Sequence, residues 1–122
     1  SINKQLIHID REVHYLGNIT PHEVSDPNYV IDVATKTSRL LGCKGYTGID
    51  MVLDENGQAY VIDVNARPTT AIVSLSNLAV NISELIFKAA LGLALPKSVE
   101  IKGKHVFLKT DIDVRDSIQG TL

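Results

Sequence analysis

Several features are scarce or missing in this 122-residue chain, and each absence argues against a class of protein. The single cysteine, Cys43, excludes an internal disulfide and is typical of a reducing compartment, so we expect a cytoplasmic protein. The formal net charge of −2 lacks the basic excess typical of nucleic-acid binding. No apolar run reaches the roughly 18–20 residues of a membrane span. We therefore expect neither nucleic acid nor a membrane as partner, whereas a homodimer is left open.

The remaining composition is that of an ordinary globular protein. Hydrophobic residues make up 44% of the chain, and its length allows one domain with a core. The four histidines show neither the i, i+4 spacing nor the cysteine partners typical of zinc sites. The informative chemistry must therefore lie elsewhere in the chain.

One stretch, from Gly48 to Arg67, carries most of the functional signal. Two short apolar segments flank Asn56-Gly57, the dipeptide most typical of a two-residue hairpin turn. We therefore predict an antiparallel hairpin centred on this dipeptide. The predicted register makes these pairs: Gly48 with Asn65, Asp50 with Asp63, and Val52 with Val61.

The two faces of the predicted hairpin differ in character, because side chains alternate along a strand. One face presents two carboxylates and an amide at its open end, from Asp50, Asp63 and Asn65. The other face is expected to pack in the core, because its residues are all apolar or aromatic: Ile49, Met51, Leu53, Tyr60, Ile62 and Val64.

Facing carboxylates repel each other unless a cation or a proton lies between them. Hard oxygen ligands suit Mg²⁺ (or Mn²⁺), with phosphates and water completing the coordination. Arg67 follows Asn65 by two residues, and its planar fork suits phosphate oxygens. On this chemistry alone, two hydrated acids at a strand end are the alternative.

The pattern of Asp50 on one strand and Asp63-x-Asn65-x-Arg67 on the next resembles the metal-binding hairpin of the ATP-grasp ligases. Asp50 matches the first metal ligand of that family. The later residues match its Glu-x-Asn-Pro-Arg motif, with two departures. Asp63 is one methylene shorter than the usual glutamate, and Pro68 follows the arginine instead of preceding it.

The resemblance implies an α+β fold, an antiparallel β-sheet with helices on one face, similar to the C-terminal ATP-grasp subdomain. It implies that Asp50, Asp63 and Asn65 bind metal, that Asn65 and Arg67 bind nucleotide, and that Arg67 is catalytic. The implied reaction joins a small-molecule carboxylate to an amine through an acyl phosphate, with ATP as substrate and Mg²⁺ (or Mn²⁺) as cofactor. The alternative is a non-catalytic metal- or nucleotide-binding module.

In that family the phosphate-binding lysines and the glycine-rich loop precede the region of resemblance. We therefore expect residues 1–122 to be the C-terminal portion of a longer, ADP-forming ligase, inactive when isolated. The run from Asp63 to Thr70 is similar to small archaeal-type amino-acid ligases, including tyramine–glutamate ligase.

The rest of the chain is organised by turn and cap signals. Asp26-Pro27 predicts a helix start and Gly42 its end. A hydroxyl-rich loop is expected over residues 68–77. The resemblance implies that Thr69, Thr70 and Ser74 in this loop contact the acceptor substrate, and hydrogen bonds to their own backbone are the alternative. The other expected elements are a hairpin over residues 5–16 that ends at Gly17-Asn18, a helix over 82–91, a hairpin pairing 99–101 with 105–108, and a mobile tail over 111–122.

Overall fold

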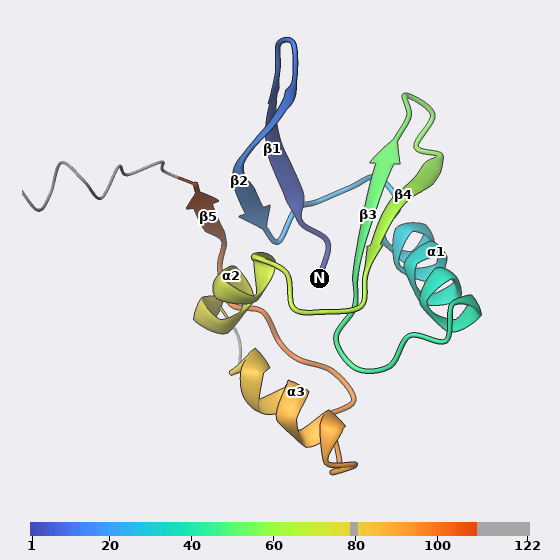
Figure 1. Cartoon of the computed structure of the whole chain (residues 1–122), viewed down its shortest axis with the longest axis vertical. Helices are drawn as coiled ribbons and strands as arrows, with labels where there is room; N and C mark the ends of the chain where they lie inside the picture. The colour runs from blue at the N-terminus through green and yellow to red at the C-terminus, as the bar shows by residue number, and fades with distance from the viewer. Residues whose placement is uncertain (79–80, 110–122) are drawn as a thin grey trace, which may run out of the picture.

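The computed structural model describes residues 1–78 and 81–109, which form two antiparallel sheets and three helices (Figure 1). The tail predicted for residues 111–122 lies outside the described residues. In chain order the elements are β1 (Lys4–Ile9), β2 (Val13–Thr20), α1 (Pro27–Leu40), β3 (Gly48–Leu53), β4 (Ala59–Asn65), α2 (Ala71–Leu78), α3 (Ile82–Ala90) and β5 (His105–Leu108).

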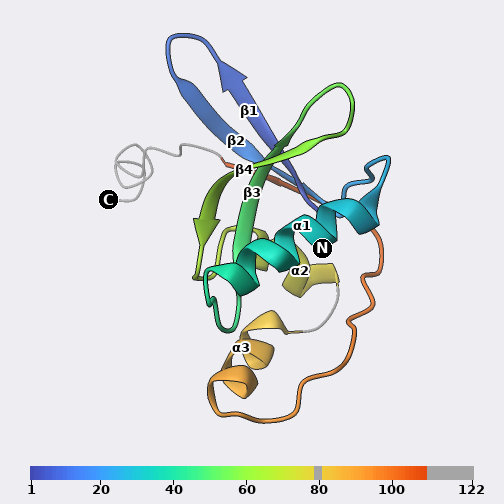
Figure 2. The same cartoon turned by 90° about the vertical axis from the view of Figure 1, so that its right-hand side faces the viewer.

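The predicted α+β class with antiparallel strands is confirmed, with the strands divided between two sheets. One sheet has the order β1-β2-β5, and the other is the β3-β4 hairpin. Helix α1 lies against the β3-β4 hairpin, as the rotated view shows (Figure 2). Helix α2 contacts both β2 and β5 of the first sheet. The segment between β4 and α2 thus connects the two halves of the fold.

Two expectations about strand pairing are wrong. Strand β2 does not end at Gly17-Asn18 but continues to Thr20, and its last residues pair with β5. Residues 99–101 form no strand, so β5 takes β2 as its partner instead of a local hairpin. Gly17 permits this pairing, because a Cβ there would lie 2.0 Å from the carbonyl oxygen of Phe107. The missing side chain lets the two backbones approach.

The two predicted helices are confirmed. Both were predictable because each is capped by a side chain close to it in the sequence. The Asp26 carboxylate accepts a hydrogen bond from the backbone N–H of Tyr29, and Pro27 occupies the first turn of α1. The Asn81 side chain caps α3 in the same way, through the N–H of Glu84. Gly42 follows α1 with a φ of +65°, the left-handed conformation common after a helix end.

The segment expected to be a hydroxyl-rich loop contains a helix, α2, which corrects the sequence prediction. Ala71 and Ser74, one turn apart, are both buried on its inner face. Serine has a weak helix propensity because its hydroxyl competes for backbone hydrogen bonds. Here the Ser74 hydroxyl bonds outside the helix, so that this competition is removed.

A buried polar cluster joins α2 to the first sheet. Asn18, Thr20 and Ser74 are at most 3% exposed. The side-chain oxygen of Asn18 accepts hydrogen bonds of 3.2 Å from the hydroxyls of both Thr20 and Ser74. A 3.0 Å hydrogen bond links the Ser74 hydroxyl to Nδ1 of His105, the first residue of β5. One amide therefore holds strand β2 and helix α2 together, and Ser74 extends the network to β5.

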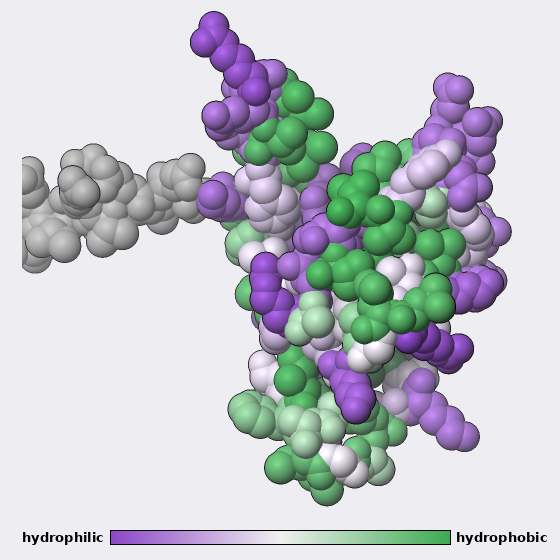
Figure 3. Space-filling view, turned by 45° about the vertical axis from the view of Figure 1, so that its right-hand side comes forward, coloured by the Kyte–Doolittle hydropathy of each residue, from purple (hydrophilic) through white to green (hydrophobic). Residues whose placement is uncertain are grey.

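Apolar burial, in contrast, is small. Among the described residues the buried apolar side chains are Val30, Ala59 and Ala71. Large exposed apolar side chains occur along every strand and helix, including Phe87 of α3 at about 70%, and Leu91, which follows this helix, is equally exposed. The lower end of the molecule, where α3 lies, is accordingly apolar in Figure 3. No single described helix is long and apolar enough to span a membrane; α2 and α3 reach that length only as a bent pair.

Replacing Asn18 by alanine should lower the free energy of unfolding by about 2–4 kcal/mol, because buried hydroxyls lose their acceptor. Chemical denaturation of the purified chain measures this change. Asn28→Ala, at an exposed position of α1, is the matched control and should change stability by less than about 0.5 kcal/mol. Equal effects of the two substitutions would contradict the role of the polar cluster.

Gly17→Ala should cost at least about 3 kcal/mol of unfolding free energy, because its overlap with the Phe107 backbone cannot be relieved by a rotamer change. Gly42→Ala is the control: it also has a positive φ, yet a Cβ at this position would have no atom within 4 Å beyond its chain neighbours. It should cost only about 1–2 kcal/mol of backbone strain. A Gly17→Ala protein as stable as Gly42→Ala would show that the β2-β5 pairing is unimportant.

Candidate metal and nucleotide site

The loop that closes the β3-β4 hairpin is built on Asp54. Its carboxylate accepts hydrogen bonds of 2.9 Å from the backbone N–H groups of Asn56 and Gln58, and its carbonyl accepts one from Gly57. Gly57 has a φ of +80°. A three-residue turn that ends in a left-handed glycine is a common hairpin connection. The predicted two-residue turn is therefore wrong by one residue.

A bulge in β4 compensates for this offset. From the loop inwards, Leu53 pairs with Ala59, Val52 with Tyr60 and Met51 with Val61. The predicted pairing of Val52 with Val61 is therefore wrong. The ladder then shifts, leaving Ile62 as the extra residue, and Asp50 pairs with Asp63. The predicted facing carboxylates and the predicted Gly48–Asn65 pair are confirmed, because the two one-residue offsets cancel.

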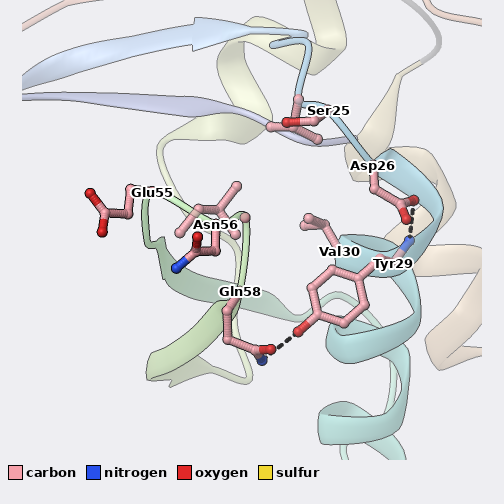
Figure 4. Close-up of a pocket in the computed structure, with 10 residues that line it drawn as sticks. Ser25, Asp26, Tyr29, Val30, Glu55, Asn56 and Gln58 are labelled. Atoms are coloured by element: carbon pink, nitrogen blue, oxygen red, sulfur yellow. Dashed lines mark hydrogen bonds between the residues drawn. The ribbon is translucent and has the colours of Figure 1, made fainter.

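Helix α1 supports the loop end of the hairpin (Figure 4). The Tyr29 hydroxyl accepts hydrogen bonds from the Gln58 side-chain amide at 2.6 Å and from the Ala59 backbone at 3.3 Å. A cleft of about 380 Å³ lies between this end of α1 and the loop. The carboxylates lie at the opposite, open end of the hairpin, so this cleft is separate from them.

The open end of the hairpin presents oxygen donors. Asp50 is half-buried and Asp63 is exposed. The Asn65 amide nitrogen donates a 2.7 Å hydrogen bond to the Asp63 carboxylate, which leaves the amide oxygen available to a ligand. In the described part of the chain, neither aspartate forms an ion pair, and no group of three histidine, cysteine or acidic side chains could hold a metal by itself. Two carboxylates and an amide suit Mg²⁺ only when phosphate or water supplies the remaining oxygens.

The large apolar side chains of the hairpin, unlike the small Ala59, are not buried within the described part of this chain. Tyr60 is 54% exposed and Ile62 is 66% exposed, in contrast to the predicted burial of that face. Ile62 is the bulged residue, and α1 is the only described helix with several contacts to β4. Too few elements surround the hairpin here to cover both of its faces.

Arg67 is exposed and lies just beyond β4. Its guanidinium donates one 3.2 Å hydrogen bond to the carbonyl oxygen of Pro68, and its other donors have no hydrogen-bond partner among the described residues. The structure thus brings Asp50, Asp63 and Asn65 together at the end of the hairpin, with Arg67 on the adjoining segment.

The hydroxyls that follow Arg67 bond to side chains of other elements, so the expectation that they satisfy their own backbone is wrong. Thr69 is hydrogen-bonded to the Tyr46 hydroxyl at 3.1 Å, and Thr70 to the Tyr15 hydroxyl at 3.2 Å. Ser74 is buried in the polar cluster, without exposed surface for a substrate. Sequence reasoning missed both tyrosines, because such long-range bonds leave no periodic pattern.

The chain belongs to the ATP-grasp family, since residues 1–71 match the ATP-grasp domain. The fold agrees with this assignment. The chain superposes on N5-carboxyaminoimidazole synthetase from Staphylococcus aureus, crystallised with ADP, with a TM-score of 0.72 and 17% sequence identity. The similar region covers 86% of this chain and 30% of that enzyme.

Relatives in sequence include several D-alanine–D-alanine ligases. The Nitrosospira multiformis ligase is 39% identical over 96 residues, covering 70% of this chain and 31% of the ligase. An uncharacterised protein of Methanocaldococcus jannaschii is 26% identical over 118 residues, covering 97% of this chain and 28% of that protein. The chain therefore spans about three-tenths of the length of these relatives.

Asp50→Asn should raise the free energy of unfolding by about 0.2–1 kcal/mol in the presence of EDTA, because it removes the repulsion between facing carboxylates. Denaturant titration at low ionic strength measures the gain. Glu55→Gln, in the hairpin loop, changes the net charge equally without a facing acid and should leave stability unchanged. Destabilisation by Asp50→Asn would mean that the two carboxylates do not repel each other.

Proposed function

We propose that this chain supplies the Mg-ATP-binding hairpin of an ATP-dependent ligase that joins a small-molecule carboxylate to an amine. The pairing of Asp50 with Asp63, beside Asn65, is the observation that carries the proposal. Two like charges held opposite each other cost stability, so their presence at the open end of a hairpin favours a cation ligand. The ATP-grasp family assignment supports a nucleotide as the source of the remaining oxygens.

In this proposal Asp50, Asp63 and Asn65 hold Mg²⁺ against the terminal phosphates of ATP. The hydrogen bond from Asn65 fixes the orientation of the Asp63 carboxylate and keeps the amide oxygen on the ligand side. A metal ion held by these residues would supply positive charge to offset negative charge on the phosphates during transfer. Asp63 is shorter than a glutamate, so we propose that it binds one metal ion and leaves further ligands to the nucleotide.

Arg67 would bind the transferred phosphoryl group in the same scheme. Its exposed guanidinium has donors without a hydrogen-bond partner in the described part of the chain, and its planar fork can contact two phosphate oxygens at once. Transfer of the γ-phosphoryl group to the substrate carboxylate would form an acyl phosphate and release ADP. Attack by the amine would then form the amide and release phosphate. Arg67 would stabilise charge on the phosphoryl oxygens in both steps.

We propose further that the complete catalytic site includes residues beyond these 122, because the relatives are about three times as long as the region they share with this chain. The exposed apolar surface of β3-β4 and α3 supports this view, since large apolar patches mark contact surfaces. The narrower likeness to archaeal tyramine–glutamate ligases stays a prediction.

Asp63→Asn should weaken Mn²⁺ binding to the 122-residue chain by at least about tenfold, because the ion loses a charged ligand. Mn²⁺ is paramagnetic, so selective broadening of the backbone NMR signals of Asp50, Asp63 and Asn65 measures its binding. Glu55→Gln is the control and should bind as the parent does. Broadening spread over all exposed acids, with no preference for the hairpin end, would refute the metal site.

A non-catalytic metal- or nucleotide-binding module is the second candidate, and Arg67→Lys separates it from the ligase. The ammonium retains the charge but cannot form a two-pronged phosphate contact. In the full-length gene product that contains this sequence, we expect carboxylate- and amine-dependent ADP release to fall by roughly 10²-fold or more, with Mn²⁺ binding unchanged. A parent protein that binds Mn²⁺ and ADP but releases no ADP from ATP would favour the non-catalytic module.

A further inference from the structure

We propose that Tyr15 and Tyr46 are positioning residues that hold segment 66–70 beside the carboxylate end of the hairpin. The hydroxyl of Tyr15 is hydrogen-bonded to Thr70 and that of Tyr46 to Thr69, and we call these two hydrogen bonds the pins. The pins are observed as hydrogen bonds of 3.2 and 3.1 Å. The role of the pinned segment, presenting Arg67 to phosphate, rests on the proposed function.

The first pin fixes the segment to β3. Tyr46 lies two residues before Gly48, which pairs with Asn65 at the open end of the hairpin. A Cβ on Gly48 would lie only 2.6 Å from Cγ2 of Thr69. The methyl group of Thr69 therefore occupies the space that the glycine leaves free, while its hydroxyl bonds to Tyr46. Shape and hydrogen bonding together fix Thr69.

The second pin fixes the segment to the other sheet. The Tyr15 hydroxyl, besides its contact with Thr70, accepts a 3.1 Å hydrogen bond from the side-chain amide of Asn18. Asn18 is buried and is bonded in turn to Ser74 of α2. Thr70 is thus linked to the buried polar cluster that joins β2 and α2.

Arg67 lies between two fixed points as a consequence. Asn65 is paired with Gly48 in the hairpin, and Thr69 is held by Tyr46. The carbonyl oxygens of Thr69 and Thr70 also accept hydrogen bonds from the backbone N–H groups of Ile72 and Val73 in α2. Phosphate binding by an exposed arginine depends on how well its backbone is fixed, because a misplacement of about 1 Å can cost 10²-fold in rate.

Amide hydrogen exchange in the 122-residue chain tests the pins without any ligand. We expect Tyr46→Phe and Tyr15→Phe each to accelerate exchange over residues 66–70 by roughly two- to tenfold, with β1 unchanged. Tyr60→Phe is the control, because its hydroxyl makes only a 3.4 Å contact with Asp54 near the hairpin loop. Unchanged exchange over 66–70 in the double variant would overturn the proposal.

A swap at Gly48 and Thr69 tests whether the pinned position matters for binding. The test uses the full-length gene product that contains this sequence. Gly48→Ala in that protein should weaken the binding of Mn²⁺–ADP by at least about fivefold, because the new methyl group displaces Thr69. Adding Thr69→Ser should restore affinity, since serine keeps the hydroxyl and lacks the clashing methyl. Thr69→Val, which keeps the methyl and loses the hydroxyl, should give no rescue.

The two tests separate the pins from the proposed function. If the parent chain fails to bind Mn²⁺ alone, the proposed metal site is wrong, whereas exchange over 66–70 still decides whether the tyrosines pin the segment. If the full-length protein and its Gly48→Ala variant bind Mn²⁺–ADP with equal affinity, the positioning role is overturned. The positioning role would be supported if Thr69→Ser restored the affinity of the Gly48→Ala protein and Thr69→Val did not. General destabilisation of the protein would affect both double variants alike.

Discussion

The hydrogen bonds of the buried Asn18 side chain are the interaction on which the arrangement of this chain depends. The amide oxygen accepts hydrogen bonds from the hydroxyls of Thr20 and Ser74, and the amide nitrogen donates one to the hydroxyl of Tyr15. Few apolar side chains are buried among the described residues, so the hydrophobic effect contributes little to holding helix α2 against strand β2. Directional hydrogen bonds between buried groups can hold the two elements together, because each buried donor and acceptor is costly to leave unpaired.

This polar cluster also determines where the hydroxyl-rich segment after the hairpin lies. One end of segment 66–70 continues from β4, and the other enters α2, whose Ser74 is bonded to Asn18. Figure 1 shows this segment running from β4 to α2, the helix that contacts the other sheet. Arg67 lies within the segment. The candidate site thus combines a buried polar cluster with an exposed arginine. Exposed apolar strands and helices around it offer surface for further contacts.

Much of the candidate site was predictable, although the path from sequence to geometry was only partly correct. Facing carboxylates at Asp50 and Asp63 were expected from a tight turn at Asn56-Gly57. The actual turn is one residue longer, and the bulge at Ile62 restores the pairing. A bulge has no reliable sequence signal, since it depends on how the whole strand fits its partner. The tyrosine–threonine contacts were missed for a related reason, because they join residues far apart in the chain.

Elements whose stabilising contacts are local could be recognised in the amino-acid sequence alone. Asp26 caps α1 and Asn81 caps α3 within three residues, so both helices are visible in the chain. Long-range packing, in contrast, pairs β5 with β2, divides the strands between two sheets, and makes residues 71–78 helical. Those outcomes depend on contacts such as Gly17 against Phe107 and Ser74 against Asn18. Such contacts come into existence only after distant segments have met, and no short stretch of sequence encodes them.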